Sequence, residues 1–142
     1  MDHVVYLDAK TKELERMLDG SKSMIIRGAA GRKMPYGRVH AGDTLYFINN
    51  NAEGVIRASA AAKTVFNSNK MSKEESIQIV ETNQDKLQLT NKQIKRWAGK
   101  RYLVLIEVED PSEVEPFPID RSNYGNMDDW LPVEDIETVK IS

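Results

Sequence analysis

The chain has 142 residues, 40% of them hydrophobic, and a formal net charge of −2, which together predict one compact domain with a buried core. It contains no cysteine and only two histidines, so disulfides and thiolate chemistry are excluded, and no metal site and no cofactor are expected. The first residues lack the pattern of a signal peptide and no apolar run approaches the roughly 18 residues of a membrane span, so we expect a cytoplasmic protein without membrane contact.

The chain begins with a pattern of strand followed by helix. The run "VVYLD" at 4–8 is of β type, and Asp8 stands where a helix N-cap belongs. In the next segment, 9–18, three apolar residues fall at i, i+3 and i+4 and therefore share one helical face. Gly20 provides a C-terminal stop, so the helix is expected to lie between Asp8 and Gly20.

A second strand and a long basic loop follow. The run "SMIIRGAA" at 23–30 predicts a strand, and the turn residues of "GRKMPYGRVHAGD" at 31–43 predict an exposed loop. The stretch between Lys22 and Gly42 contains five basic side chains and no carboxylate. The members of this basic strip are Lys22, Arg27, Arg32, Lys33 and Arg38.

The middle of the chain predicts a hairpin and two helices. The runs at 44–50 and 54–66 read as antiparallel strands joined by "NNAEG", whose Asn and Gly residues tolerate turn conformations. Two capping boxes, Ser72 with Glu75 and Thr90 with Gln93, mark helix starts. Trp97 continues the apolar stripe of the second helix, so we expect it in the core.

The last third is expected to contain a central strand and an irregular extension. The near-continuous apolar run "RYLVLIEVED" at 101–110 is typical of a strand buried on both faces. Pro111, Pro116 and Pro118 are expected to break the chain into an extended tail. We therefore predict one α+β domain over 1–142 with a small barrel, on which an acidic, aromatic extension at 110–142 packs.

The charges are unevenly distributed along the chain. From Glu107 to Glu137 there are eleven acidic residues and a single basic one, Arg121, whereas the basic strip has no acidic residue. Either the two regions form solvated surfaces that attract each other, or the basic strip binds an anion.

Familiar catalytic motifs are missing from the sequence. The segment "GAAGRK" lacks the spacing and the Lys-Ser/Thr pair of a Walker phosphate loop, which argues against kinase or ATPase chemistry. No serine stands in a nucleophile elbow, and only His3 and His40 could act as histidine bases, so a serine triad is poorly supported. Lysine and arginine at the ends of the strand at 23–30 suit phosphate binding instead.

The order of these elements resembles the ASCH domains of the PUA-like superfamily. In those domains a G-x-K segment after a helix, a strand with arginine and a G-D hairpin follow one another. The residues that match are Gly20, Lys22, Arg27, Gly42 and Asp43. The strand "YLVLIEV" looks like the one that closes such barrels, so the resemblance covers residues 3 to 109, while the C-terminal tail resembles the EVE-like branch.

The resemblance implies a PUA-like pseudo-β-barrel, with a strongly bent, mostly antiparallel sheet and inserted helices. It also implies a cleft that binds RNA, single-stranded nucleic acid or a modified nucleobase. In this interpretation the basic strip contacts phosphate and aromatic side chains stack on a base. The expected aromatic residues are Tyr36, Tyr124 and Trp130.

Two alternatives remain open. Some small ASCH proteins are amidohydrolases that remove an acetyl group from acetylated cytidine, with a lysine, a hydroxyl three residues later and a carboxylate from the helical insert. Lys22 matches the lysine, Asp85 or Glu81 falls near the carboxylate position, and Ile25 replaces the hydroxyl, so Lys22 and Asp85 would be the working pair. The second alternative is a protein-interaction domain whose acidic tail contacts the partner.

Overall fold

A computed structural model describes residues 1–125 and 127–141 of the chain. In chain order the elements are β1 (Asp2–Leu7), α1 (Glu13–Leu18), β2 (Met24–Ala29), β3 (Thr44–Asn49), β4 (Val55–Asn67), α2 (Lys73–Thr82), α3 (Gln84–Leu87), α4 (Asn91–Trp97), β5 (Tyr102–Pro118), β6 (Trp130–Glu134) and the 3₁₀ helix η1 (Ile136–Thr138). Among the described residues, no helix is long and apolar enough to cross a membrane.

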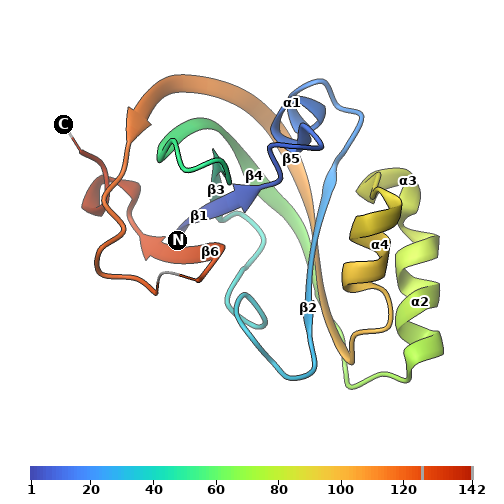
Figure 1. Cartoon of the computed structure of the whole chain (residues 1–142). Helices are drawn as coiled ribbons and strands as arrows, with labels where there is room; N and C mark the ends of the chain where they lie inside the picture. The colour runs from blue at the N-terminus through green and yellow to red at the C-terminus, as the bar shows by residue number, and fades with distance from the viewer. Residues whose placement is uncertain (126, 142) are drawn as a thin grey trace.

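The six strands form one strongly curled sheet in the order β2-β5-β4-β3-β1-β6. All neighbouring pairs are antiparallel except β1 and β3, which run parallel. The long strands β4 and β5 bend through the molecule and give the sheet the shape of a half-barrel (Figure 1). This confirms the predicted α+β fold with a bent, mostly antiparallel sheet, and it confirms the hairpin β3–β4 and the central place of the apolar strand β5.

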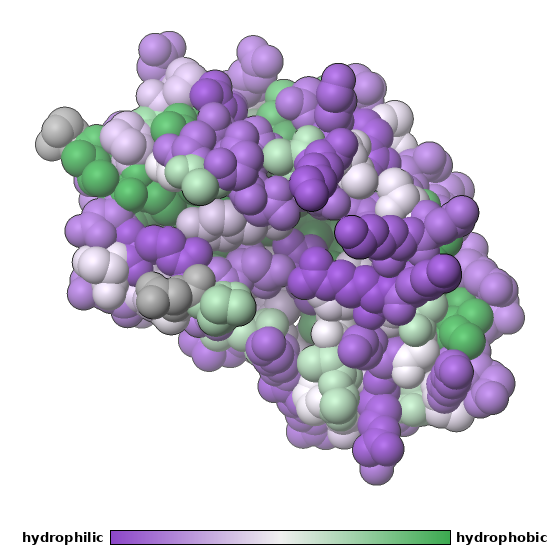
Figure 2. Space-filling model, viewed as in Figure 1, coloured by the Kyte–Doolittle hydropathy of each residue, from purple (hydrophilic) through white to green (hydrophobic). Residues whose placement is uncertain are grey.

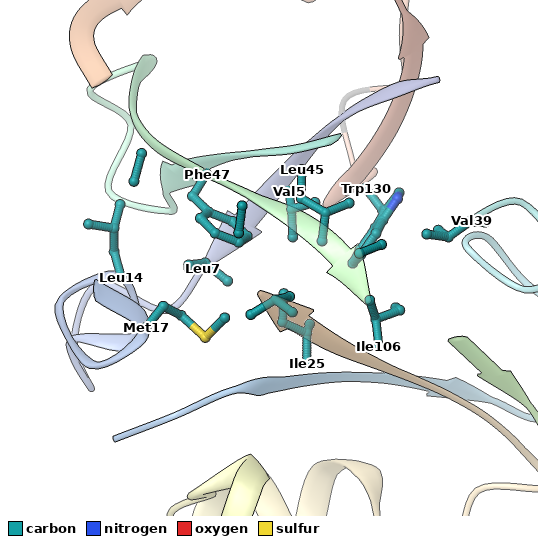
Figure 3. Close-up of a cluster of buried hydrophobic side chains, with 14 of the residues drawn as sticks. Val5, Leu7, Leu14, Met17, Ile25, Val39, Leu45, Phe47, Ile106 and Trp130 are labelled. Atoms are coloured by element: carbon teal, nitrogen blue, oxygen red, sulfur yellow. The ribbon is translucent and has the colours of Figure 1, made fainter. Parts of the chain in front are cut away.

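Apolar residues are buried on both faces of β2. Ile25 packs into the main core inside the curl, together with Val5, Phe47 and Trp130 (Figure 3). Its neighbours in sequence point to the opposite face because side chains alternate along a strand. There they pack against α2, α3 and α4 in a second cluster. The helices therefore cover one face of β2 and β5, at the right of Figure 1.

Both predicted capping boxes are present. The Ser72 side chain accepts a hydrogen bond from the Glu75 backbone and Thr90 accepts one from Gln93, and each partner side chain bonds back to the cap residue. These reciprocal bonds satisfy backbone N–H groups that a helix start would leave without partners. The start of α4 is thus fixed by its own sequence.

The first helix begins later than predicted. Asp8 is not its N-cap, because the Asp8 side chain accepts a hydrogen bond from the backbone of Lys10 and forms a local turn. The helix starts at Glu13, after Lys12 in the left-handed region with φ of 56°. The expected stop is confirmed, since α1 ends before Gly20, which has φ of 83°.

The prolines do not break the chain after residue 110. Strand β5 continues to Pro118 and stays paired with β4, with register shifts along the way. Strand β2 pairs with β5 only as far as Glu107, so beyond that point one edge of β5 has no strand partner among the described residues. Proline is tolerated where its nitrogen faces such an edge, because no ladder hydrogen bond is lost.

The last segment joins the sheet. Strand β6 pairs antiparallel with β1, and Ile119 forms an isolated bridge with Lys140. Trp130 at the start of β6 is only 1% exposed. The residues from 110 to Pro118 therefore belong to β5, and β6 is part of the same sheet, with Trp130 in its core.

Candidate nucleic-acid interface

Two adjoining cavities open where the curled sheet does not close. The edge strand β2 lies there opposite β1 and the residues before β6, and α4 forms a further wall. The first cavity has a volume of about 220 Å³ and the second about 340 Å³. We call the two together the cleft. The residues that line both cavities are Arg27, Arg96, Trp97, Met127 and Asp129.

Arg27 spans the open side of the sheet. Its guanidinium donates hydrogen bonds to the carbonyl of Tyr6 on β1, at 2.7 Å, and to the carbonyl of Ile26, at 2.8 Å. Its Nε lies 3.3 Å from a carboxylate oxygen of Asp129, without the alignment of a hydrogen bond. The side chain is 11% exposed, so Arg27 is a largely buried cation on the cleft wall.

Helix α4 brings an aromatic ring and a second arginine to the cleft. The Arg96 guanidinium lies 4.3 Å from the centre of the Trp97 ring, and that of Arg27 lies 5.9 Å from it. Trp97 is 9% exposed and also packs in the cluster beneath the helices, which confirms its predicted place in the core. Arg96 is exposed, so a ligand can reach its guanidinium from solvent.

The second cavity is the more basic of the two. Besides the shared residues it is lined by Lys33 and Lys100, both exposed at the surface. Asp129 is its one carboxylate among the residues that the structure describes. The face of the molecule shown in Figure 2 is mainly hydrophilic.

The other members of the basic strip lie apart from one another. Lys22 is 1% exposed and lines neither cavity of the cleft, so it does not meet Arg27 at a common anion site. The Arg32 guanidinium lies 5.6 Å from the Tyr36 ring and 5.7 Å from the Tyr102 ring. Arg38 is exposed on the loop. Of the five basic residues, Arg27 and Lys33 line the cleft.

Lys22 forms a buried ion pair. Its Nζ lies 3.3 Å from a carboxylate oxygen of Glu13 on α1 and donates a hydrogen bond to the carbonyl of Leu87 on α3. Burial lowers the pKa of Lys22 from 10.5 to about 8, and the Glu13 carboxylate opposes that shift. The enzyme alternative pairs Lys22 with Asp85, but Asp85 lies exposed on α3 and the carboxylate that Lys22 contacts is that of Glu13.

The three predicted stacking residues lie in different surroundings. Trp130 is buried and its indole nitrogen donates to His3 Nδ1 at 3.1 Å, so it offers no face to a base. Tyr124 is half-buried against the cluster of Val4 and Leu131. Tyr36 donates from its hydroxyl to the carbonyl of Ser68 and lies beside the second cavity, in a small hollow of about 10 Å³.

Several residues of the cleft were not predicted from the sequence. Arg96 and Lys100 belong to the helical segment, far along the chain from the basic strip, and the sequence offered no local signal for them. Asp8 and Gln93 line the first cavity, together with Asn50. Among the described residues, no group of three or more His, Asp or Glu side chains is placed to hold a metal ion.

The fold is similar to that of a solved ASCH protein from Zymomonas mobilis. Crystal structures of two variants of that protein align with TM-scores of 0.70 at 12% identity, over 96% of this chain and 93% and 91% of theirs. A further ASCH structure from the same organism aligns with a TM-score of 0.68 at 13% identity, over 94% of this chain and 89% of the other. No protein-family model and no curated protein matches the sequence. The chain therefore has the ASCH fold, as the sequence resemblance implied.

Proposed function

We propose that the chain binds single-stranded RNA or a modified nucleotide in the cleft between β2, α4 and the residues before β6. The observation that carries the proposal is that Arg27, Arg96 and Trp97 line two adjoining cavities, the second of which is also lined by two surface lysines. Arginine and lysine neutralise phosphates, and an aromatic ring or a guanidinium plane can stack on an unpaired base. The ASCH fold, which the sequence resemblance associates with RNA, supports the same function.

Fluorescence anisotropy with a labelled single-stranded RNA tests this proposal. The logarithm of affinity is expected to fall linearly with the logarithm of salt concentration, with a slope of about −0.7 for each phosphate contact. Arg96→Ala is expected to weaken binding by about tenfold, equivalent to about 1.4 kcal/mol, because it removes a cation and part of the stacking surface. Lys92→Ala is the control, since Lys92 is an exposed lysine of the same helix that lines neither cavity.

Two results would contradict nucleic-acid binding in the cleft. The first is an affinity that does not change with salt, because binding of a polyanion releases counterions. The second is an equal loss of affinity in Arg96→Ala and Lys92→Ala, because a general loss of positive charge would then explain the effect without the cleft.

A hydrolase of acylated nucleosides is a second candidate, favoured by the lowered pKa of Lys22. An amine with a pKa of about 8 loses its proton nearer to pH 7 than an ordinary lysine does. Beside a carboxylate, such an amine can serve as a base or nucleophile. Ile25, where the resembled enzymes carry a hydroxyl, is 1% exposed in the main core. We therefore expect little or no hydrolysis of acetylated cytidine.

Chromatography of acetylated cytidine incubated with the purified protein distinguishes the two functions. Robust deacetylation that disappears in Lys22→Ala would favour the enzyme over the binding protein. Ile25→Thr is expected to cost stability, because it places a hydroxyl in the core.

A further inference from the structure

The two ends of the cleft have different chemistry. The first cavity contains Asp8, Asn50 and Gln93, which the second lacks, and the second contains Lys33 and Lys100, which the first lacks. One end therefore combines carboxylate and amide groups, and the other is cationic. The Arg96–Trp97 pair lies between them, because both residues line both cavities.

We propose that the cleft binds a nucleoside monophosphate in one orientation, with the phosphate at the Lys33–Lys100 end and the base at the Asp8 end. The inference rests on the proposed function and adds a ligand class to it. The base is one that carries an exocyclic amino group, as cytosine and adenine do, because the Asp8 end presents a hydrogen-bond acceptor to that group.

The contacts of Asp8 support its role as the acceptor. Asp8 is half-buried; one carboxylate oxygen accepts from the Lys10 backbone at 3.0 Å, and the other lies 3.5 Å from the Gln93 amide nitrogen. An ionised carboxylate offers about four lone-pair sites, so these two contacts leave capacity for a ligand amino group. An oxo group in that place would face another acceptor, and such a base is disfavoured.

The neighbours of Asp8 hold this end of the cleft in shape. The side-chain oxygen of Gln93 accepts from the Thr90 backbone in the capping box, which directs the Gln93 amide nitrogen toward Asp8 and Thr11. The side-chain oxygen of Asn50 accepts from the Ala9 backbone at 2.9 Å, so its amide nitrogen remains the donor of that residue. An amide donor beside a carboxylate acceptor matches a base edge on which an amino group lies next to a ring nitrogen acceptor, as in cytosine and adenine.

The opposite end suits a phosphate. Lys33 and Lys100 come from the loop after β2 and from the residues after α4, and both are exposed, so their ammonium groups can move to a bound anion. Arg27 lies between the two ends, with Asp129 beside it. Of the described side chains at this end, cations outnumber carboxylates, and a monoanionic or dianionic phosphate is favoured there over a neutral hydroxyl.

NMR titration of the isotopically labelled protein with CMP, UMP and cytidine tests the orientation. CMP is expected to bind more tightly than UMP, because the two differ in the group that faces Asp8. The double variant Lys33→Ala/Lys100→Ala is expected to weaken CMP binding by about tenfold, equivalent to about 1.4 kcal/mol, and to leave cytidine binding unchanged. Asp8→Asn is expected to remove the preference for CMP over UMP.

Asp85→Asn is the matched control for Asp8→Asn, because it removes an exposed carboxylate that lines neither cavity. The amide spectrum of each variant shows whether it is folded. Equal affinities of CMP and UMP, or an equal loss of CMP and cytidine binding in the lysine variant, would overturn the orientation while RNA binding stands. If neither RNA nor any nucleotide binds, the proposed function fails and this inference fails with it.

Discussion

His3 is held as a neutral ring between two partners. Its Nε2 lies 2.9 Å from a carboxylate oxygen of Asp43, and its Nδ1 accepts a hydrogen bond from the indole nitrogen of Trp130. An indole N–H can only donate, so Nδ1 must carry a lone pair and the proton is on Nε2. The charged groups near the ring are Asp43, Asp2 and the amino group of Met1.

Stability is expected to fall when His3 is protonated. Burial lowers the pKa of His3 below 6.5, although the hydrogen bond and charge of Asp43 oppose this. The unfolded chain therefore binds more protons than the folded one below about pH 6.5, and the free energy of unfolding falls as the pH drops through that value. Urea denaturation at a series of pH values measures the slope.

The variant His3→Gln is expected to remove most of this slope between about pH 7.5 and 5.5, because the slope has the size that one titrating group produces. Burial raises the pKa of Asp43, but hydrogen bonds from His3 and from the His40 backbone outweigh it and hold that pKa below 3.8, so Asp43 stays charged in this window. His40→Gln serves as the control because His40 is exposed. An unchanged slope in His3→Gln would show that other groups cause the acid sensitivity.

The buried ion pair of Lys22 and Glu13 leads to a second prediction about single residues. At pH 7 the Lys22 ammonium is charged, because its pKa is about 8. Lys22→Met leaves the Glu13 carboxylate without its cation and is expected to lower the free energy of unfolding by about 3 to 5 kcal/mol. The double variant Lys22→Met/Glu13→Gln is expected to recover much of the loss, because no unpaired buried charge remains at this position. Single and double variants of equal stability would refute this account.

At the scale of elements, the start of α4 links stability to binding. Thr90→Ala removes the hydroxyl that caps the helix and is expected to cost about 1 kcal/mol, measured by urea denaturation. Because Arg96 and Trp97 lie on the same helix, the variant is also expected to bind RNA more weakly. Thr90→Ser keeps the hydroxyl and should behave like the parent protein; a similar loss in Thr90→Ser would mean that the cap is not the cause.

Elements with strong local signals could be predicted from the sequence, and others could not. The capping boxes at Ser72 and Thr90 and the hairpin turn depend on neighbouring residues, and each was found where it was expected. The start of α1 was misplaced because Asp8 bonds to Lys10 in a turn, and a turn and an N-cap use the same residue types. The full length of β5 was not predicted, because the effect of a proline depends on whether its nitrogen faces a paired or an unpaired edge of the strand. Strand pairing is set by the tertiary structure and not by the neighbouring residues.

At the scale of the whole molecule, the same distinction explains which parts of the cleft were predicted. Arg27 and Lys33 belong to a local excess of basic residues that is visible in the sequence. Arg96 and Lys100 join them only because the helical insert packs beside β2, an arrangement that composition does not encode. The sequence also gave no sign that Lys22 would be buried against Glu13 while Lys33 stayed at the surface.

The pairing of β1 with β6 has a consequence for how the chain folds during its synthesis on the ribosome. Val5 pairs with Phe47 on one side and with Trp130 on the other, so one edge of β1 finds its partner early in synthesis and the other finds it late. Until residues 130–134 emerge, an apolar strand edge is open to other chains, and such edges promote aggregation. Translation speed over the last third of the chain should therefore affect the yield of native protein more than translation speed near the start.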